Sequence, residues 1–297
     1  MGPTASAWGD GTVLSDEQRD MQPGRFVALL YHDVHPGDTF AYGRIGRSAT
    51  MYHVAEQAFL RHLHFIGERQ LEVLGLEALR SRLDSAAGSG TSPGVALCFD
   101  DGWKGAVDRA AAALAERRWP GFFFVTTGFI GRPLFAAPQD LRRLPPTLFT
   151  VGSHGATHRM LSSLPPHEIR RELSDSKQQL QQLLGTPVTA LSVPGGAHDP
   201  RVLAIAQEVG YTEIFTSTVA LNPTTLGRRN IARIAVRRST DDAALRRWLA
   251  FRLERERARA GMLAVPKRLL GMRGYSRLRR LLLGEGDGSG HRHVFDP

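Results

Sequence analysis

The stretch Leu97-Cys98-Phe99-Asp100-Asp101-Gly102 decides the fold of this chain, because an apolar run ends there in two adjacent carboxylates and a glycine. The preceding residues 95–99 are predicted to form a buried strand, which Gly102 ends. Two neighbouring acids at such a position repel each other and are costly to remove from water. Inside a strand their side chains would point to opposite faces, but in the following turn both can reach one pocket. The pair therefore indicates either a site that binds a cation or moves protons, or a helix N-cap formed by Asp101.

Strands and helices are predicted to alternate on both sides of this stretch. This alternation predicts an α/β fold of parallel strands with right-handed crossovers, either a barrel or a doubly wound sheet. Polar clusters follow the predicted strands at their C-terminal ends, which is the edge where such folds place their sites. The predicted strands are 26–31, 71–74, 95–99, 122–125, 149–151, 189–193, 213–216 and 231–236, and the helices are 52–69, 76–83, 104–118, 165–184 and 200–209.

Composition limits the class of protein. The 297 residues, 42% of them hydrophobic, suit one large domain or one domain with appendages and exclude a disordered chain. Cys98 is the single cysteine, so no internal disulfide can form, and it is predicted to be a core residue. Residues 1–24 show no basic segment followed by an apolar core, so they are interpreted as a flexible leader. No run reaches the length of about 18 apolar residues that spans a membrane. We therefore expect a cytoplasmic protein, with peripheral attachment to the inner face of the membrane as an open alternative.

A second polar cluster, Ser153-His154-Gly155-Ala156-Thr157-His158, follows another predicted strand. Two histidines four residues apart can face the same way and bind a borderline metal. A zinc-protease helix is excluded because Gly155 stands where that motif needs glutamate. Alone, this spacing is as typical of structural histidines as of metal ligands. Together with the aspartate pair it offers three protein ligands and leaves positions for water and substrate, as in catalytic zinc sites.

With both clusters in view, the chain resembles the polysaccharide deacetylases of carbohydrate esterase family 4, the NodB-homology domain, over residues 25–240. FDDG at 99–102 matches the first motif of that family, and SHGATH at 153–158 matches the second. The resemblance implies a distorted (β/α)7-type barrel. It also implies a bound divalent metal, by default Zn²⁺, with Co²⁺, Ni²⁺, Mn²⁺ and Fe²⁺ as alternatives. The implied roles are general base for Asp100 and metal ligand for Asp101, His154 and His158.

The third motif of the family is only partly present. Leu191-Ser192-Val193-Pro194-Gly195-Gly196 keeps the proline and glycine but lacks the arginine that pairs with the base in the family. Arg233, at the start of the last predicted strand, is a candidate to orient the base instead. A backbone N–H near Gly195 or Gly196 is expected to stabilise the oxyanion. Pro194 and Tyr31 are further substrate or oxyanion candidates.

The family's last motif, Leu-x-His near the C-terminus, is missing, but Leu29-Leu30-Tyr31-His32 stands near the N-terminus. This resembles the branch of the family with permuted motifs, found in exopolysaccharide deacetylases. The resemblance assigns the general acid to His32, with His35 and His198 as alternatives; a purely structural role of His32 in a loop also remains open.

The net charge of +9 comes mainly from residues 241–280, which hold twelve Arg or Lys against four Asp or Glu. Residues 241–283 are predicted to form two basic amphipathic helices, either packed on the domain or contacting an anionic membrane surface. No nucleic-acid-binding motif is present, so no nucleic acid is expected as a partner. Residues 284–297 are interpreted as a flexible tail.

The resemblance implies metal-dependent deacetylation of an acetylated sugar, such as an N-acetylhexosamine in a polysaccharide or a lipid-linked glycan. One alternative is a hydrolase of a non-peptide C–N bond in a small amide. Another is a catalytically silent member of the family that binds glycans or membranes.

Overall fold

The computed structural model describes residues 24–37, 50–84, 92–196, 198–222 and 230–262. Nine strands of this part form one sheet in which every pairing between strands is parallel. The order is β10-β9-β8-β7-β6-β5-β1-β11, with β4 paired to β5 beside this path. The strands are β1 (Phe26–Tyr31), β4 (Glu72–Val73), β5 (Gly94–Phe99), β6 (Gly121–Val125), β7 (Phe149–Ser153), β8 (Ala190–Ser192), β9 (Glu213–Phe215), β10 (Asn230–Ile231) and β11 (Ile234–Ala235).

The sheet curls into a barrel that is nearly closed by one short stretch of chain. Strand β10 forms one edge and β11 the other, yet only Ala232 and Arg233 separate them in the sequence. Because the three residue steps from Ile231 to Ile234 span at most about 11 Å, the two edges must lie close together. The distorted (β/α) barrel that the sequence predicted is therefore confirmed. The expected single strand over 231–236 is instead two strands, because the chain crosses from one edge of the sheet to the other.

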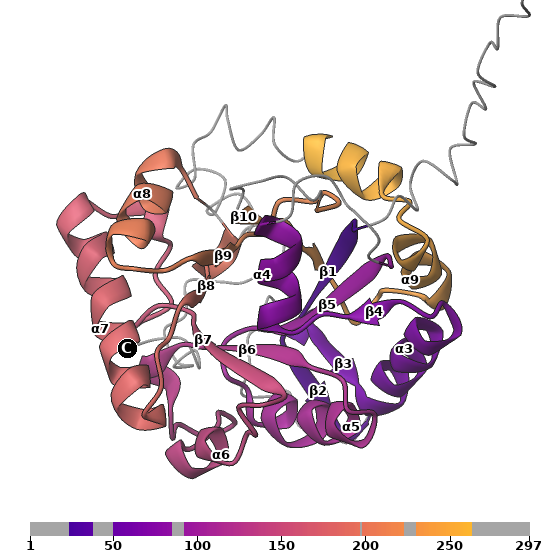
Figure 1. Ribbon diagram of the computed structural model, residues 1–297, viewed down its shortest axis with the longest axis horizontal. Coiled ribbons are helices and arrows are strands. Elements are labelled where there is room, and N and C mark those ends of the chain that lie inside the picture. Colours follow the sequence, from indigo (N-terminus) through magenta and orange to yellow (C-terminus); the bar gives the residue numbers. More distant parts are fainter. Residues whose placement is uncertain (1–23, 38–49, 85–91, 197, 223–229, 263–297) are drawn as a thin grey trace, which may run out of the picture.

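Alternation along the strands separates two hydrophobic layers. Side chains such as Leu29, Leu97 and Phe123 face the surrounding helices, whereas Ala28, Cys98 and Phe122 fill the barrel interior, so Cys98 is a core residue as predicted. Helix α4 packs Leu79 and Leu83 into the interior layer, and Figure 1 shows it lying across the middle of the curled sheet. The helices are α3 (Glu56–Glu68), α4 (Leu76–Asp84), η2 (Ala106–Ala110), α5 (Ala111–Glu116), η3 (Thr127–Phe129), α6 (Pro138–Arg142), η4 (Leu161–Ser163), α7 (Pro166–Leu184), η5 (Pro194–Gly196), α8 (Pro200–Glu208) and α9 (Asp242–Leu249), and residues 254–262 are helical as well.

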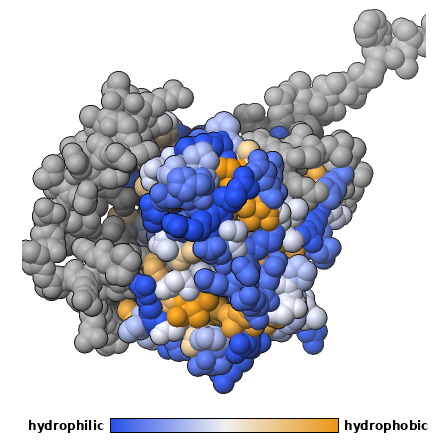
Figure 2. All heavy atoms as spheres, turned by 90° about the vertical axis from the view of Figure 1, so that its left-hand side faces the viewer, coloured by the Kyte–Doolittle hydropathy of each residue, from blue (hydrophilic) through white to orange (hydrophobic). Residues whose placement is uncertain are grey.

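Helix α7 shows how local sequence sets these elements. Proline begins its first turn, where no helical N–H bond is lost, and Gly185 ends it in the left-handed conformation with φ 71°. Its inner face buries Ile169, Leu173 and Leu180, and the outer surface around α7 and α8 is mostly hydrophilic (Figure 2).

Helix α9, which follows β11, packs on the core of the barrel. Leu245, Trp248 and Leu249 of α9 are buried in the same cluster as the helix-facing side of the barrel, and Arg246 lies 3.7 Å from the centre of the Phe65 ring on α3. The apolar face of α9 is therefore covered by the barrel, as in the packed interpretation. Residues 263–283 of the predicted basic extension, the 284–297 tail and residues 1–23 of the leader lie outside the described residues.

The start of α3 also differs from the sequence expectation. A small parallel pair, β2 (Asp33–His35) with β3 (His53–Ala55), precedes α3, so the helix expected from residue 52 begins at Glu56. Among the described residues, no helix is long and apolar enough to cross a membrane.

Candidate metal centre and active site

Asp101, His154 and His158 offer one ligand atom each, and these atoms lie within 4.8 Å of one another. Oδ1 of Asp101 is 3.3 Å from Nε2 of His154 and 3.2 Å from Nε2 of His158. Ligand atoms about 2.1 Å from one tetrahedral cation are about 3.4 Å apart, so these separations match a shared metal ion. The His158 side chain is 27% exposed while the other two are buried, so the cluster opens to solvent on the His158 side.

The turn after β5 brings Asp101 into this cluster. Asp101 and Gly102 both adopt positive φ, 74° and 85°, and this breaks the alternation of the strand. Asp100 therefore follows the interior-facing residues of β5, while Asp101 turns toward the histidines that follow β7. This is the geometry expected from the sequence, with both acids at the strand end but not equivalent.

The ring of His154 is oriented by the neighbouring strand. Its Nδ1 lies 2.8 Å from the backbone oxygen of Ser192 in β8. The carbonyl can only accept, so Nδ1 carries the proton and Nε2 presents its lone pair toward Asp101.

The loop that carries both histidines is held by buried polar groups of α7. One carboxylate oxygen of Glu172 accepts bonds from the backbone N–H groups of Ala156 (3.1 Å) and Thr157 (2.9 Å), and the other accepts from the Thr157 hydroxyl (2.6 Å). Ser176, one turn later, bonds the hydroxyl of Ser153 at 2.7 Å. These contacts shape the loop in which His158 has a positive φ of 63°.

The residues present fit a divalent metal. Oδ1 of Asp101 is buried and has no hydrogen-bond partner in the described part of the chain, although it faces two imidazole nitrogens. An unpaired buried carboxylate oxygen is costly unless a cation binds it. One carboxylate and two imidazoles are a ligand set that suits zinc and related transition metals.

Asp100 lies beside this cluster and is held by a guanidinium. Arg233 donates from Nη1 to Oδ1 (2.8 Å) and from Nη2 to Oδ2 (3.0 Å), and Ser192 Oγ donates to Oδ2 at 2.9 Å. Arg233 is itself fixed by Thr216, whose carbonyl accepts from Nε at 2.9 Å. The structure thus places Arg233 where the sequence suggested a base-orienting residue, and Oδ2 of Asp100 lies 3.9 Å from Nε2 of His154.

Charge and burial act in opposite directions on the two carboxyl groups. Burial raises the pKa of Asp100, but attraction to Arg233 and His154, with the hydrogen bonds from Arg233, holds it below its usual value. Burial also opposes ionisation of Asp101, but attraction to His158 and the close approach of both imidazoles hold its pKa well below the usual range. The pKa of His154 is lowered by burial but raised overall by Asp100 and Asp101. The site therefore carries a negative field that favours a cation.

His32 follows β1 on the same side of the site. The register pairs Tyr31 with Phe99, so His32 and Asp100 come next on neighbouring strands. The imidazole is half-buried and stacks on Tyr52 with a centroid separation of 4.7 Å. Its Nδ1 is buried without a hydrogen-bond partner among the described residues. Burial lowers the pKa of His32, and the charges of Asp101 and Asp100 partly oppose this shift.

Tyr31 does not reach the site, contrary to the expectation from its motif. Its side chain is fully buried, its ring stacks on Phe99, and its hydroxyl bonds Nδ1 of His62 on α3 at 3.2 Å. The reason is alternation: a strand that directs His32 toward the barrel interior directs Tyr31 to the helix-covered face.

The turn after β8 supplies one candidate oxyanion donor rather than two. The N–H of Gly196 is used by the carbonyl of Val193 at 2.9 Å, and Pro194 has no N–H. The N–H of Gly195 has no hydrogen-bond partner within the described residues. Gly195 has φ 63°, a conformation that favours glycine.

The two alternative candidates for the general acid, His35 and His198, are each bonded to backbone in their own loops. Nδ1 of His35 lies 2.9 Å from the carbonyl of Gly37 in its own loop, and Nδ1 of His198 lies 3.0 Å from the carbonyl of Gly196. Both are bonded to nearby backbone, so neither replaces His32 as the leading candidate.

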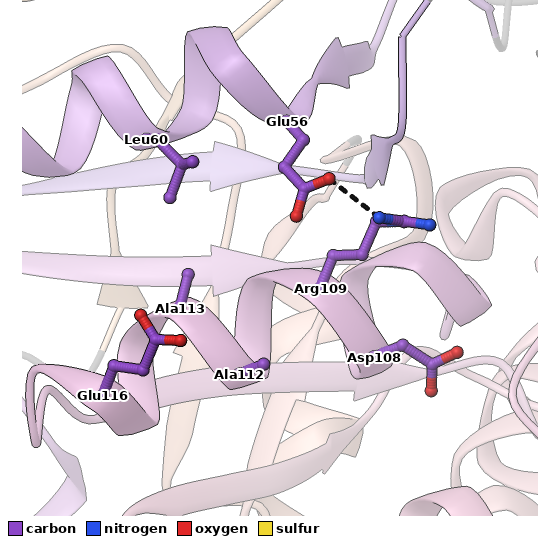
Figure 3. A pocket seen from close by; sticks show the side chains of 7 residues that line it. All are labelled: Glu56, Leu60, Asp108, Arg109, Ala112, Ala113 and Glu116. Atoms are coloured by element: carbon purple, nitrogen blue, oxygen red, sulfur yellow. Dashed lines mark hydrogen bonds and ion pairs between the residues drawn. The ribbon is translucent and has the colours of Figure 1, made fainter. Parts of the chain in front are cut away.

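A separate pocket of about 440 Å³ lies between α3 and the η2–α5 helix (Figure 3). Glu56 of α3 pairs across it with Arg109 at 2.8 Å, and Asp108 and Glu116 add negative charge to its lining. It contains none of the residues around Asp101, so it is not part of the metal centre.

Comparison with known proteins identifies the domain that carries this geometry. Residues 87–214 match the family model described as polysaccharide deacetylase, and they include both aspartates, both histidines and the turn after β8. This part of the chain therefore resembles the polysaccharide deacetylase family. The chain is also similar to an uncharacterized 30.6 kDa protein of Geobacillus stearothermophilus, with 28% identity over 123 residues. That match covers 41% of this chain and 45% of the relative's length.

Solved deacetylases share its fold. The deacetylase PplD of Streptococcus pyogenes, solved with acetate, superposes with a TM-score of 0.65 at 19% identity, over 75% of this chain and 97% of PplD. IcaB from Ammonifex degensii gives 0.64 at 20% identity, over 77% and 98%. A de-N-acetylase from Aggregatibacter actinomycetemcomitans gives 0.63 at 17% identity, over 75% and 99%. At these identities the likeness shows the curled barrel fold.

Three residues of the deacetylase site were missed from the sequence. Ser192 orients both Asp100 and His154, Glu172 holds the histidine loop, and Trp103 bonds Asp101. Ser192 stood inside the degenerate third motif, which was a usable signal. Glu172 lies on the buried face of α7 beside Ile169 and Leu173, and a buried acid at that position was visible from the helical period.

Proposed function

We propose that this deacetylase-family chain is a metal-dependent hydrolase that removes the acetyl group from an N-acetylated hexosamine in a polysaccharide or lipid-linked glycan. The observation that carries the proposal is the proximity of an arginine-held carboxylate to a metal-type ligand set: Oδ2 of Asp100 lies 3.9 Å from Nε2 of His154. A base beside a ligand set is the arrangement that metal-assisted hydrolysis needs.

In this proposal Asp101, His154 and His158 hold the metal ion. When bound, such an ion supplies Lewis-acid activation of water and of the acetyl carbonyl. The distances and the unpaired Oδ1 of Asp101 support this ligand set. Two structural neighbours, a deacetylase solved with acetate and a de-N-acetylase, support the choice of an acetyl group.

Asp100 is proposed to accept the proton of the attacking water. Its carboxylate is ionised because Arg233 holds its pKa down, and Arg233 and Ser192 fix its orientation. These three hydrogen bonds leave acceptor capacity on Oδ1 for the proton. The N–H of Gly195 is the proposed donor to the oxyanion.

His32 is proposed to protonate the leaving nitrogen. Its free Nδ1 and the nearby carboxylates, which oppose the effect of burial, support an acid at this position. An amide leaving group needs such an acid more than an ester does, because an amide anion is a much poorer leaving group than an alkoxide.

The test combines metal content with acetate release. Purified protein is analysed for bound transition metal, stripped with a chelator, reloaded and assayed on N-acetylated and O-acetylated hexosamine oligomers. We expect Asp100→Asn to retain metal and lose about 10²–10⁴-fold in rate, and Asp101→Asn to lose metal. Asp175→Asn, on the exposed side of α7, is the matched control. Wild-type protein without metal affinity, or an Asp100→Asn variant with unchanged rate, would show that the assignment is wrong.

A further inference from the structure

Trp103 makes the contact that decides how Asp101 presents its carboxylate. The indole Nε1–H donates to Oδ2 of Asp101 at 2.9 Å, and the indole is 1% exposed. The other oxygen, Oδ1, faces the two imidazoles at 3.3 and 3.2 Å. The two oxygens of one carboxylate therefore have different partners.

The indole is held so firmly that it can impose this division. Phe135 stacks on it with a centroid separation of 4.3 Å, and His53 of β3 packs edge-on at 4.5 Å. The backbone on either side is tied to the same segment: Ala136 N–H donates to Gly102 (2.9 Å) and Lys104 N–H donates to Leu134 (2.9 Å). The irregular stretch that follows β6 thus serves as the support for this tryptophan.

The same contact stabilises an unfavourable backbone. Asp101 has φ 74°, a left-handed conformation that is unfavourable for a residue with a side chain. A buried hydrogen bond between residues two apart closes this turn and opposes its relaxation. Loss of the N–H would free both the carboxylate rotation and the turn.

We propose that Trp103 is a positioning residue that makes Asp101 a one-oxygen ligand of the metal ion. With Oδ2 occupied by the indole N–H, only Oδ1 binds, and more coordination positions stay open for water and substrate. Without that bond, Asp101 can rotate and chelate through both oxygens. This inference rests on the proposed metal-dependent function, and it concerns a residue outside the ligand set.

The substitution Trp103→Phe removes the donor and keeps an aromatic ring between Phe135 and His53. We expect its metal affinity to fall by about 10- to 100-fold, measured by competition with a chromophoric chelator. Loaded with Co²⁺, it should also show weaker visible d–d absorption than wild type, because a second carboxylate oxygen raises the coordination number. Trp119→Phe is the matched control, since Trp119 packs against the core away from the site. It should leave both measurements unchanged.

The outcomes separate this inference from the proposed function. If wild-type protein binds no metal, both are wrong. If wild type binds metal and Trp103→Phe matches it in affinity and in Co²⁺ spectrum, only the role of Trp103 is wrong. Should Trp103→Phe fail to fold, 3-benzothienylalanine at position 103 replaces the N–H by sulfur in a ring of the same shape. Unchanged affinity and spectrum in that variant would equally overturn the inference.

Discussion

Replacing Arg233 by methionine leaves the carboxylate of Asp100 in the barrel interior without its cation. The Arg233 side chain is 0% exposed and that of Asp100 is 3% exposed. Both terminal nitrogens of the guanidinium, Nη1 and Nη2, donate to the carboxylate. Removing one partner of a buried ion pair costs about 3–5 kcal/mol because the remaining charge is uncompensated. The carbonyl of Thr216 also loses its donor, which adds about 1 kcal/mol.

A double-mutant cycle isolates the ion pair from these other losses. Asp100→Asn removes the charge that Arg233→Met exposes, so the double variant should be less destabilised than the sum of the single variants by about 2–3 kcal/mol at pH 7. The bond to Thr216 is lost in both variants that lack Arg233, so it cancels. Urea unfolding followed by the fluorescence of the four tryptophans measures each corner of the cycle.

The pH dependence of the cycle has a defined sign. In wild type the pKa of Asp100 is held below its usual value of 3.8, so its stabilising contribution is present above that pH and lost as the pH falls through the folded-state pKa. In Arg233→Met the attraction and hydrogen bonds of the guanidinium are lost, so burial, which raises the pKa of Asp100, is opposed much less, and protonation relieves the destabilisation as the pH falls. The difference between wild type and Arg233→Met should therefore shrink toward acid. Additive single-variant effects within about 0.5 kcal/mol, or a difference that does not shrink, would refute this account of the pair.

Three further predictions follow from other parts of the chain. Glu172→Gln replaces one of the two carboxylate oxygens that hold the histidine loop, so metal affinity should fall about tenfold by chelator competition, while Asp175→Asn, on the exposed side of α7, should match wild type. Equal affinities would contradict the role of α7. His32→Gln should slow acetate release from N-acetyl substrates by about 10²-fold or more and from O-acetyl esters much less; an equal loss on both would argue against an acid. Burial lowers the pKa of His62 from 6.5 to about 4, so the unfolded chain is protonated first and stability falls as the pH drops through this window. His62→Gln should weaken the pH dependence of the urea unfolding midpoint between these two pKa values. A midpoint that changes with pH as steeply as in wild type would contradict this prediction.

Much of the fold was predictable because its signals are local and periodic. Apolar runs with turns between them predicted the parallel strands, and proline and glycine marked the ends of α7. The polar residues at strand ends were also readable, since parallel strands bring their C-terminal ends to one edge. The alternation of side chains along a strand would also have excluded Tyr31 from the site, because neighbouring residues such as Tyr31 and His32 point to opposite faces.

The packing partner of the basic extension was less predictable than the strands and their ends. The amphipathic pattern of 242–249 showed an apolar face but not its partner, and the partner is α3, nearly two hundred residues earlier in the chain. A pattern of hydrophobic residues predicts that a helix face is buried, but it does not predict which element buries it.

The sequence by itself determined which residue types could form the candidate metal centre, because Asp101, His154 and His158 stand in short motifs whose chemistry is local. Only the tertiary structure decided how they are oriented. Arg233 reaches Asp100 across 133 residues of sequence, and it does so because the chain crosses between the two edges of the sheet there. Trp103 depends in the same way on the segment that packs against it. Orientation of a buried polar group is set by the particular partners that folding brings within hydrogen-bond distance, and spacing along the chain does not encode those partners.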